Sequence, residues 1–90
     1  MEDAEITEDG RLIYAFRRAK GEEVKIHLKQ FKGKYYFDLR IWFQSQNENM
    51  FHPTKKGISF GIDQLSEVRK GIDRLAKAAE KLTKREEIEV

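Results

Sequence analysis

The chain of 90 residues contains no cysteine, only one proline and two histidines, and its apolar runs are only a few residues long. Without cysteine there can be no disulfide and no thiolate metal site, which is typical of a reducing compartment. Runs this short do not predict a membrane-spanning helix, and the acidic opening MEDAEITEDG does not resemble a secretory leader. We therefore expect a protein with no membrane partner, cytoplasmic and nucleoid-associated in a bacterium or nuclear in a eukaryote.

Patterns that carry catalysis are also missing. No nucleophile has a neighbouring base, no glycine-rich loop is suited to hold a phosphate, and no element contains paired carboxylates. His27 and His52 have no carboxylate at ligand spacing, so a metal site is not expected. We expect no enzyme activity, no cofactor and no small-molecule substrate.

The formal net charge of +2 hides a separation of charge along the chain. All 18 basic residues lie between Arg11 and Arg85, together with only eight of the 16 acidic ones. We predict one domain at residues 11–85, an acidic flexible tail at 1–10 and an acidic tail at 86–90. A domain with this excess of positive charge attracts polyanions, although the lysines from Lys70 onward are explained by solubility alone.

Alternation of side chains predicts two strands in the first third of the chain. Residues 11–18 form the first, with Leu12, Tyr14 and Phe16 on one face. After a turn at 20–22, the second strand runs from Val24 to Phe31. It has one aliphatic face and one basic face that ends in an aromatic ring.

Two more strands follow. A tight hairpin at 32–34, with Gly33 available for a positive φ, leads into a third strand with one apolar face and one polar face. The polar face carries Lys34, Tyr36, Asp38, Arg40 and Trp42, and Asp38 is interpreted as the residue that orients Arg40 or a neighbouring lysine. A polar turn at 45–49 precedes a fourth strand at 50–60, distorted near its proline and glycine.

From Ile62 the apolar period becomes helical, with Gly61 as a plausible cap and Asp63 near the positive end of the helix. The stripe has the spacing of a coiled-coil seam, but we expect it to cover the sheet, because a lone four-stranded sheet needs a cover. Its distal half is a candidate contact with a second subunit. The fold class is therefore α+β: a four-stranded antiparallel sheet followed by one C-terminal amphipathic helix. A homodimer that shares a core would relieve the shortage of core in so short a chain. The residues of the stripe are Leu65, Val68, Ile72, Leu75, Ala79 and Leu82.

Two blocks, FKGKYYFDLRIWF and PTKKGISF, place basic and aromatic side chains side by side. Basic groups neutralise phosphates and aromatic faces stack on unpaired bases, so a sheet that interleaves them suits single-stranded nucleic acid. The alternative for any aromatic in a small domain is a place in the core.

The order of these blocks, followed by an amphipathic helix, resembles the positive cofactor four family of transcriptional coactivators, and its small bacterial and phage members in particular. The resemblance covers roughly residues 24–75. It implies a homodimer that holds single-stranded or melted DNA on a curved basic surface without reading base sequence, in transcription, replication or repair. It also implies that Phe31 stacks on bases, that Lys32 and Lys34 contact phosphate, and that Phe43 takes the place of a stacking tryptophan unless Trp42 does so. The residues expected to bind nucleic acid are Lys25, His27, Lys29, Phe31, Lys32, Lys34, Tyr36, Arg40, Trp42, Phe43, His52, Pro53, Lys55, Lys56 and Gly57.

Three positions depart from the family pattern: His52 stands where lysine is common, Thr54 replaces a frequent glycine, and Leu65 replaces a helix tryptophan. Two alternatives to DNA binding stay open. Single-stranded RNA offers the same phosphates and base faces, and an adaptor could use the basic face for an acidic protein.

Overall fold

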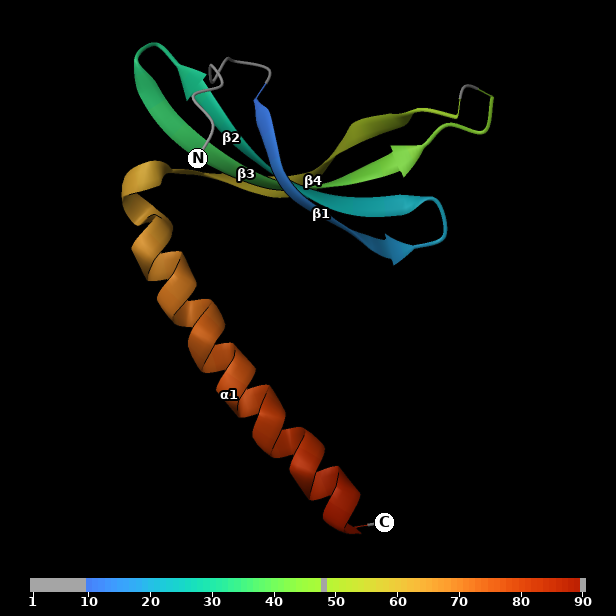
Figure 1. Cartoon of the computed structure of the whole chain (residues 1–90), viewed down its shortest axis with the longest axis vertical. Helices are drawn as coiled ribbons and strands as arrows, with labels where there is room; N and C mark the ends of the chain where they lie inside the picture. The colour runs from blue at the N-terminus through green and yellow to red at the C-terminus, as the bar shows by residue number, and fades with distance from the viewer. Residues whose placement is uncertain (1–9, 48, 90) are drawn as a thin grey trace.

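The computed structural model describes residues 10–47 and 49–89, with side chains as far as Lys84. Four strands form one antiparallel sheet in the order β1-β2-β3-β4, and the helix follows the last strand, which confirms the predicted fold class (Figure 1). The helix includes residues 86–89 of the predicted tail, whereas residues 1–9 and 90 lie outside the described residues. The elements are β1 (Arg11–Ala19), β2 (Glu22–Phe31), β3 (Lys34–Gln44), β4 (Phe51–Gly61), the 3-10 turn η1 (Ile62–Gln64) and α1 (Leu65–Glu89).

The β2–β3 hairpin has a two-residue loop, because Phe31 pairs with Lys34. Lys32 and Gly33 both have positive φ, 51° and 78°, as a type I′ turn requires, which confirms the prediction for Gly33. The polar turn between β3 and β4 is also present. It is closed by a hydrogen bond of 2.9 Å from the Ser45 amide to the Met50 carbonyl oxygen.

The face assignment predicted for β1 is wrong at Leu12. Leu12 pairs with His27, whereas Tyr14 pairs with Ile26, because a bulge at Ile13 shifts the register. Leu12 therefore lies on the opposite face from Tyr14 and Phe16. An extra residue in a strand reverses the alternation, and the sequence pattern carries no sign of it.

Very little of the apolar face is buried. Among the described residues, Phe37 is the one buried hydrophobic residue, with 5% of its surface exposed, and its ring stacks on Phe60 at 5.3 Å. The face around it borders an open apolar cavity of about 440 Å³ between the sheet and the start of α1. Its walls include Ile13, Ile26, Leu28, Leu39, Leu65, Val68 and Ile72.

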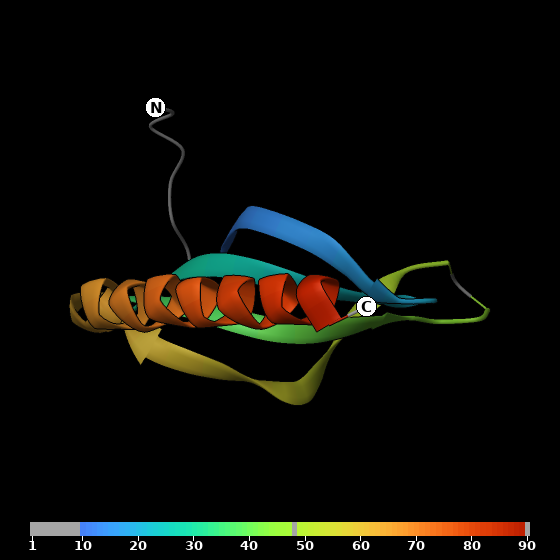
Figure 2. The same cartoon turned by 90° about the horizontal axis from the view of Figure 1, so that it is seen from below.

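The prediction that the helix covers its own sheet is wrong. In the view from below, α1 passes under the central strands (Figure 2). Figure 1 shows that the helix diverges from these strands toward its C-terminus. Ile72, Leu75 and Leu82 keep 55%, 63% and 61% of their surface exposed. The stripe has the period of a packed helix face, but nothing within the described part of the chain packs against its distal half. No helix in that part is long and apolar enough to span a membrane.

Candidate nucleic-acid interface

The pairing of β2 with β3 builds one continuous polar face. Lys25 lies opposite Arg40, His27 opposite Asp38 and Lys29 opposite Tyr36, with no bulge between these strands. Cross-strand partners project from the same side of a sheet, so the alternation predicted for both strands is confirmed. We call this side the basic face and the other the apolar face.

At the hairpin end of the basic face, an aromatic ring stands among cations. Phe31 has 47% of its surface exposed, and the Lys32 ammonium lies 5.3 Å from the centroid of its ring. Lys34 is its cross-strand partner. The predicted group of Phe31, Lys32 and Lys34 is therefore brought together by the hairpin.

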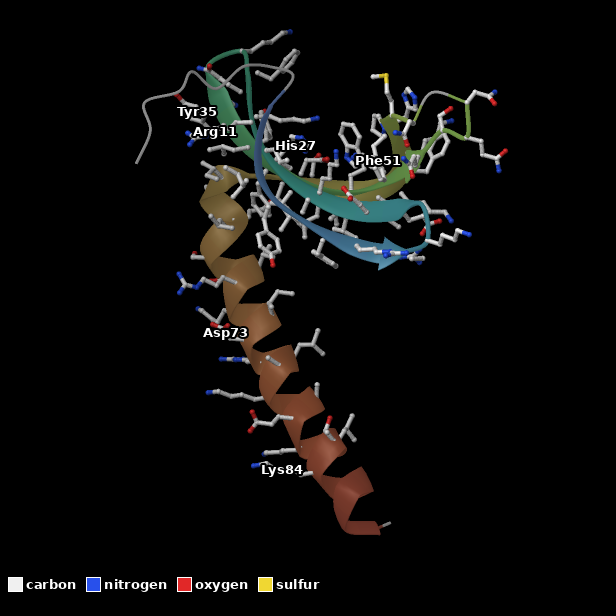
Figure 3. The ribbon with its side chains drawn as sticks, turned by 45° about the vertical axis from the view of Figure 1, so that its right-hand side comes forward. Arg11, His27, Tyr35, Phe51, Asp73 and Lys84 are labelled. Carbon is white, nitrogen blue, oxygen red and sulfur yellow. The ribbon has the colours of Figure 1, made fainter. Side chains whose placement is uncertain are left out.

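A second aromatic group occupies the other end of this face, and sequence reasoning missed one of its members. The Lys25 ammonium lies 4.5 Å from the ring centroid of Trp42 and 5.3 Å from that of Phe51. Phe51, which is labelled in Figure 3, pairs with Gln44. Gln44 shares the face of Trp42 because it lies two residues further along β3. The polar turn hid this position, because its conformation decides which face the first residue of β4 takes.

The register separates Phe43 and His52 from the other predicted site residues. Phe43 follows Trp42 directly and therefore projects to the apolar face, where it pairs with His52 at a ring distance of 5.9 Å. Of the two aromatic residues that the family resemblance left open, Trp42 is the one on the basic face.

A bulge in β4 carries the basic loop. Arg40 pairs with Gly57 and Trp42 with Pro53, so Thr54, Lys55 and Lys56 lie opposite Ile41 alone. This is the distortion predicted between the proline and the glycine. A Cβ atom at Gly57 would lie 2.7 Å from the Leu39 carbonyl oxygen, which makes glycine necessary for the close approach of the two strands.

The loop borders a hollow of about 680 Å³ at the centre of the basic face. Its lining combines an indole and a proline ring with cations, hydroxyl groups and a carboxylate. These residues are Lys29, Asp38, Arg40, Trp42, Pro53, Thr54, Lys55 and Ser59.

Asp38 and Arg40 form an ion pair in this hollow, at 2.8 Å between Arg40 Nη2 and Asp38 Oδ1. Burial alone would raise the pKa of Asp38, but hydrogen bonds from Arg40 and Ser59 and the charge of Arg40 hold it below its ordinary value. The carboxylate therefore stays ionised at neutral pH, as the interpretation of Asp38 as a partner of Arg40 requires.

His27 lies beneath the surface of the basic face. Its ring stacks on Trp42 at 5.4 Å, and only 9% of its surface is exposed. Burial and the neighbouring Lys29 lower the pKa of His27. The ring is therefore neutral at pH 7, and its geometry suits support of Trp42 better than contact with phosphate.

Within the described ranges, no group of three or more histidine, aspartate or glutamate side chains is placed to hold a metal ion.

The sequence model of one family, "Transcriptional Coactivator p15 (PC4)", matches residues 18–71, more than half of the chain. The chain belongs to the PC4 family. The match spans the β2–β3 hairpin, both aromatic groups of the basic face and the β4 bulge, and it ends in the second turn of α1. The resemblance based on the two sequence blocks is confirmed.

Solved PC4 homologues share the fold. A PC4 homolog from Burkholderia pseudomallei, in its tetragonal crystal form, superposes with a TM-score of 0.68 and 24% identity over 74% of this chain and 97% of that one. A bacteriophage T5 homolog of PC4, described as implicated in recombination-dependent DNA replication, gives a TM-score of 0.65 and 26% identity over 91% and 98% of the two chains. No curated protein matches the chain.

Proposed function

We propose that this PC4-family protein binds single-stranded DNA, without reading its base sequence, on the basic face of a homodimer. One observation carries the proposal: an aromatic group at each end of the face, with cations between them. Phe31 stands at the hairpin end, and Trp42 with Phe51 at the other. The eight steps along the strand from Lys34 to Trp42 correspond to about 26 Å of extended chain, long enough for several unstacked bases.

The two kinds of side chain have separate tasks. Lys29, Lys55 and Lys56 release counterions from the phosphate backbone, which gives affinity without sequence preference. The aromatic rings accept any base face, and each stack contributes about 1–3 kcal/mol. A duplex hides its base faces, so it binds more weakly than a single strand or a melted region. Replication, repair, recombination and transcription all expose such strands, and we propose a role in one of them.

The homodimer is supported by the apolar face. One chain leaves the cavity at the start of α1 open and the stripe of α1 exposed. Exposed apolar side chains that run from a sheet face to a helix stripe are typical of a protein interface, and a second copy offers the same sheet and the same stripe. The face that binds DNA stays free in such a dimer, because it lies on the other side of the sheet.

The test is fluorescence-anisotropy titration of labelled 20-mer oligonucleotides, single-stranded DNA, duplex DNA and single-stranded RNA, across a salt series. We expect preference for single strands, a steep salt dependence and a change in Trp42 emission. Equal, weak binding of single strands and duplex, abolished by salt and silent in fluorescence, would refute the stacking mechanism. Preferential binding of RNA would support the basic face as the binding surface but would show that its ligand is RNA and not DNA.

A further inference from the structure

The most deeply buried side chain in the described part of the chain is a charged one on the basic face. Asp38 has 2% of its surface exposed, although a carboxylate cannot bind phosphate. It accepts hydrogen bonds from Arg40 Nε at 3.0 Å, from Arg40 Nη2 at 2.8 Å and from Ser59 Oγ. These contacts use one edge of the guanidinium group and fix its plane.

The same guanidinium group reaches the β4 bulge. Arg40 Nη1 donates to the carbonyl oxygen of Thr54 at 3.0 Å, fourteen residues further along the chain. Three of the five N–H groups of Arg40 are thus engaged within the protein, and two remain. The Asp38 carboxylate also offsets the Arg40 charge, so Arg40 is a weaker phosphate ligand than an unpaired lysine.

Thr54 fastens the bulge from its own side chain. Its hydroxyl group donates to the Ile41 carbonyl oxygen at 2.7 Å and accepts the Lys56 amide at 3.1 Å. A residue without a side-chain hydroxyl at this position could form neither bond. The bulge has left the regular β3–β4 ladder at this point, so these bonds and that from Arg40 determine where Lys55 and Lys56 stand.

We infer that Asp38 is a positioning residue for nucleic-acid binding, which holds Arg40 and, through the Thr54 carbonyl, the bulge that carries Lys55 and Lys56. This inference rests on the proposed function. It adds Asp38 to the residues needed for binding, although its negative charge rules out direct contact with phosphate. Because the lysines are fixed before the ligand arrives, less conformational entropy is lost when they bind phosphate.

Replacement of the Asp38 carboxylate distinguishes a positioning role from a purely electrostatic effect, because the two predict opposite changes in affinity. Asp38→Asn removes a negative charge from a surface that binds a polyanion, so electrostatics alone predicts tighter binding of a single-stranded oligo(dT) 20-mer. The positioning role predicts weaker binding, because the guanidinium group and the bulge lose their anchor. The matched control is Glu23→Gln, which removes the same charge on the same face beside Trp42, and which should tighten binding slightly.

A double-mutant cycle shows through which groups Asp38 acts. We expect Asp38→Asn to weaken binding severalfold in the wild-type chain and to have almost no further effect when Lys55 and Lys56 are already alanine. Tighter binding by Asp38→Asn, or an equal loss with and without the two lysines, would overturn the inference. An equal loss in both backgrounds would mean that Asp38 supports the whole sheet and not the bulge.

Folding is checked by thermal unfolding of each variant. If Asp38→Asn fails to fold, Thr54→Val tests the positioning of the bulge instead. This variant removes both hydrogen bonds of the Thr54 hydroxyl group and keeps a β-branched side chain. Weaker binding that depends on Lys55 and Lys56 supports positioning of the bulge, and unchanged binding contradicts it. A wild-type chain that does not bind single strands would instead refute the proposed function, so the two failures are distinguishable.

Discussion

On the basic face, polar side chains from β3 and β4 are joined by hydrogen bonds within one chain, whereas on the apolar face large side chains stay exposed. Asp38, Arg40, Thr54 and Ser59 form a connected network around the central hollow. The apolar face buries Phe37 and leaves an open cavity beside it. The first face is thus organised within a single chain, whereas the second stays open, and we propose that a second copy covers it.

This difference has a physical origin. The hydrogen bonds of the basic face join side chains of two paired strands, so a single sheet is enough to form them. Burial of an apolar face needs a second layer, and a single helix that diverges from the sheet does not supply one. The two faces can therefore be disrupted separately, and the following variants do so in order of decreasing effect.

The largest effect is expected from a charge on the apolar stripe. Ile72→Glu places a carboxylate at a position that borders the open cavity, and a symmetric dimer would bury two of them, at a cost of several kcal/mol. We expect dissociation or unfolding, measured by sedimentation equilibrium and thermal unfolding. Lys77→Glu, on the opposite side of α1, should leave the assembly intact. A wild-type monomer, or a dimer that tolerates Ile72→Glu, would contradict the role of this face.

The basic face is tested next by its exposed ring. Phe31→Ala should weaken single-strand binding by about 1–3 kcal/mol, roughly 5-fold to 150-fold, and narrow the preference over duplex. Phe43→Ala is the matched control, because Phe43 is a phenylalanine on the other face. Anisotropy titration of both variants gives the comparison. A larger loss from Phe43 than from Phe31 would mean that the DNA follows a different path.

The basic loop should affect salt dependence more than base preference. Lys55→Ala combined with Lys56→Ala should lower the slope of log K against log salt by up to about 1.4, since each contact with single-stranded phosphate contributes about 0.7. Relative affinities for oligo(dT), oligo(dA) and oligo(dC) should not change. Substitution of Lys77 and Lys81 on α1 serves as the control for loss of two charges. An unaltered slope would show that the bulge does not touch phosphate.

Much of the basic face could be predicted from the sequence, because β2 and β3 pair without a bulge. Each residue from Lys25 to Phe31 then has a partner that simple alternation assigns correctly. Gly33 indicated the position of the hairpin turn. The end of the sheet was indicated where the apolar residues change from every second position to the spacing of a helix.

The parts that could not be predicted depend on register and on tertiary contacts. The bulge at Ile13 placed Leu12 on the opposite face from Tyr14 and Phe16, and the turn at 45–49 concealed the position of Phe51. The direction of α1 was also beyond the sequence, because an amphipathic stripe shows that a helix is covered but not by which molecule.

Phe51 itself is expected to have a moderate effect. Phe51→Ala removes one of the two rings near the Lys25 ammonium, a contribution of about 0.5–1 kcal/mol at an exposed site. We expect a loss of single-strand affinity of up to about fivefold and an altered change of Trp42 emission on binding. Phe16→Ala, on the apolar face, should not affect the emission change. Binding and emission identical to those of the wild type would remove Phe51 from the site.

The smallest effect is expected from the titration of His27, which links the basic face to stability. Burial and the charges of Lys29 and Lys25 lower the pKa of His27, whereas the charge of Asp38 raises it, and the net shift is downward. The unfolded chain therefore binds a proton at this residue more readily than the folded chain does. The free energy of unfolding should therefore fall as the pH decreases through the ordinary histidine value of 6.5, until the lower folded pKa is passed. Urea unfolding between pH 7.5 and 5, at one protein concentration, measures this slope. Asp38 does not contribute there, since its pKa lies below 3.8. His27→Gln should flatten the dependence, and an equal slope in both proteins would show that another group is responsible.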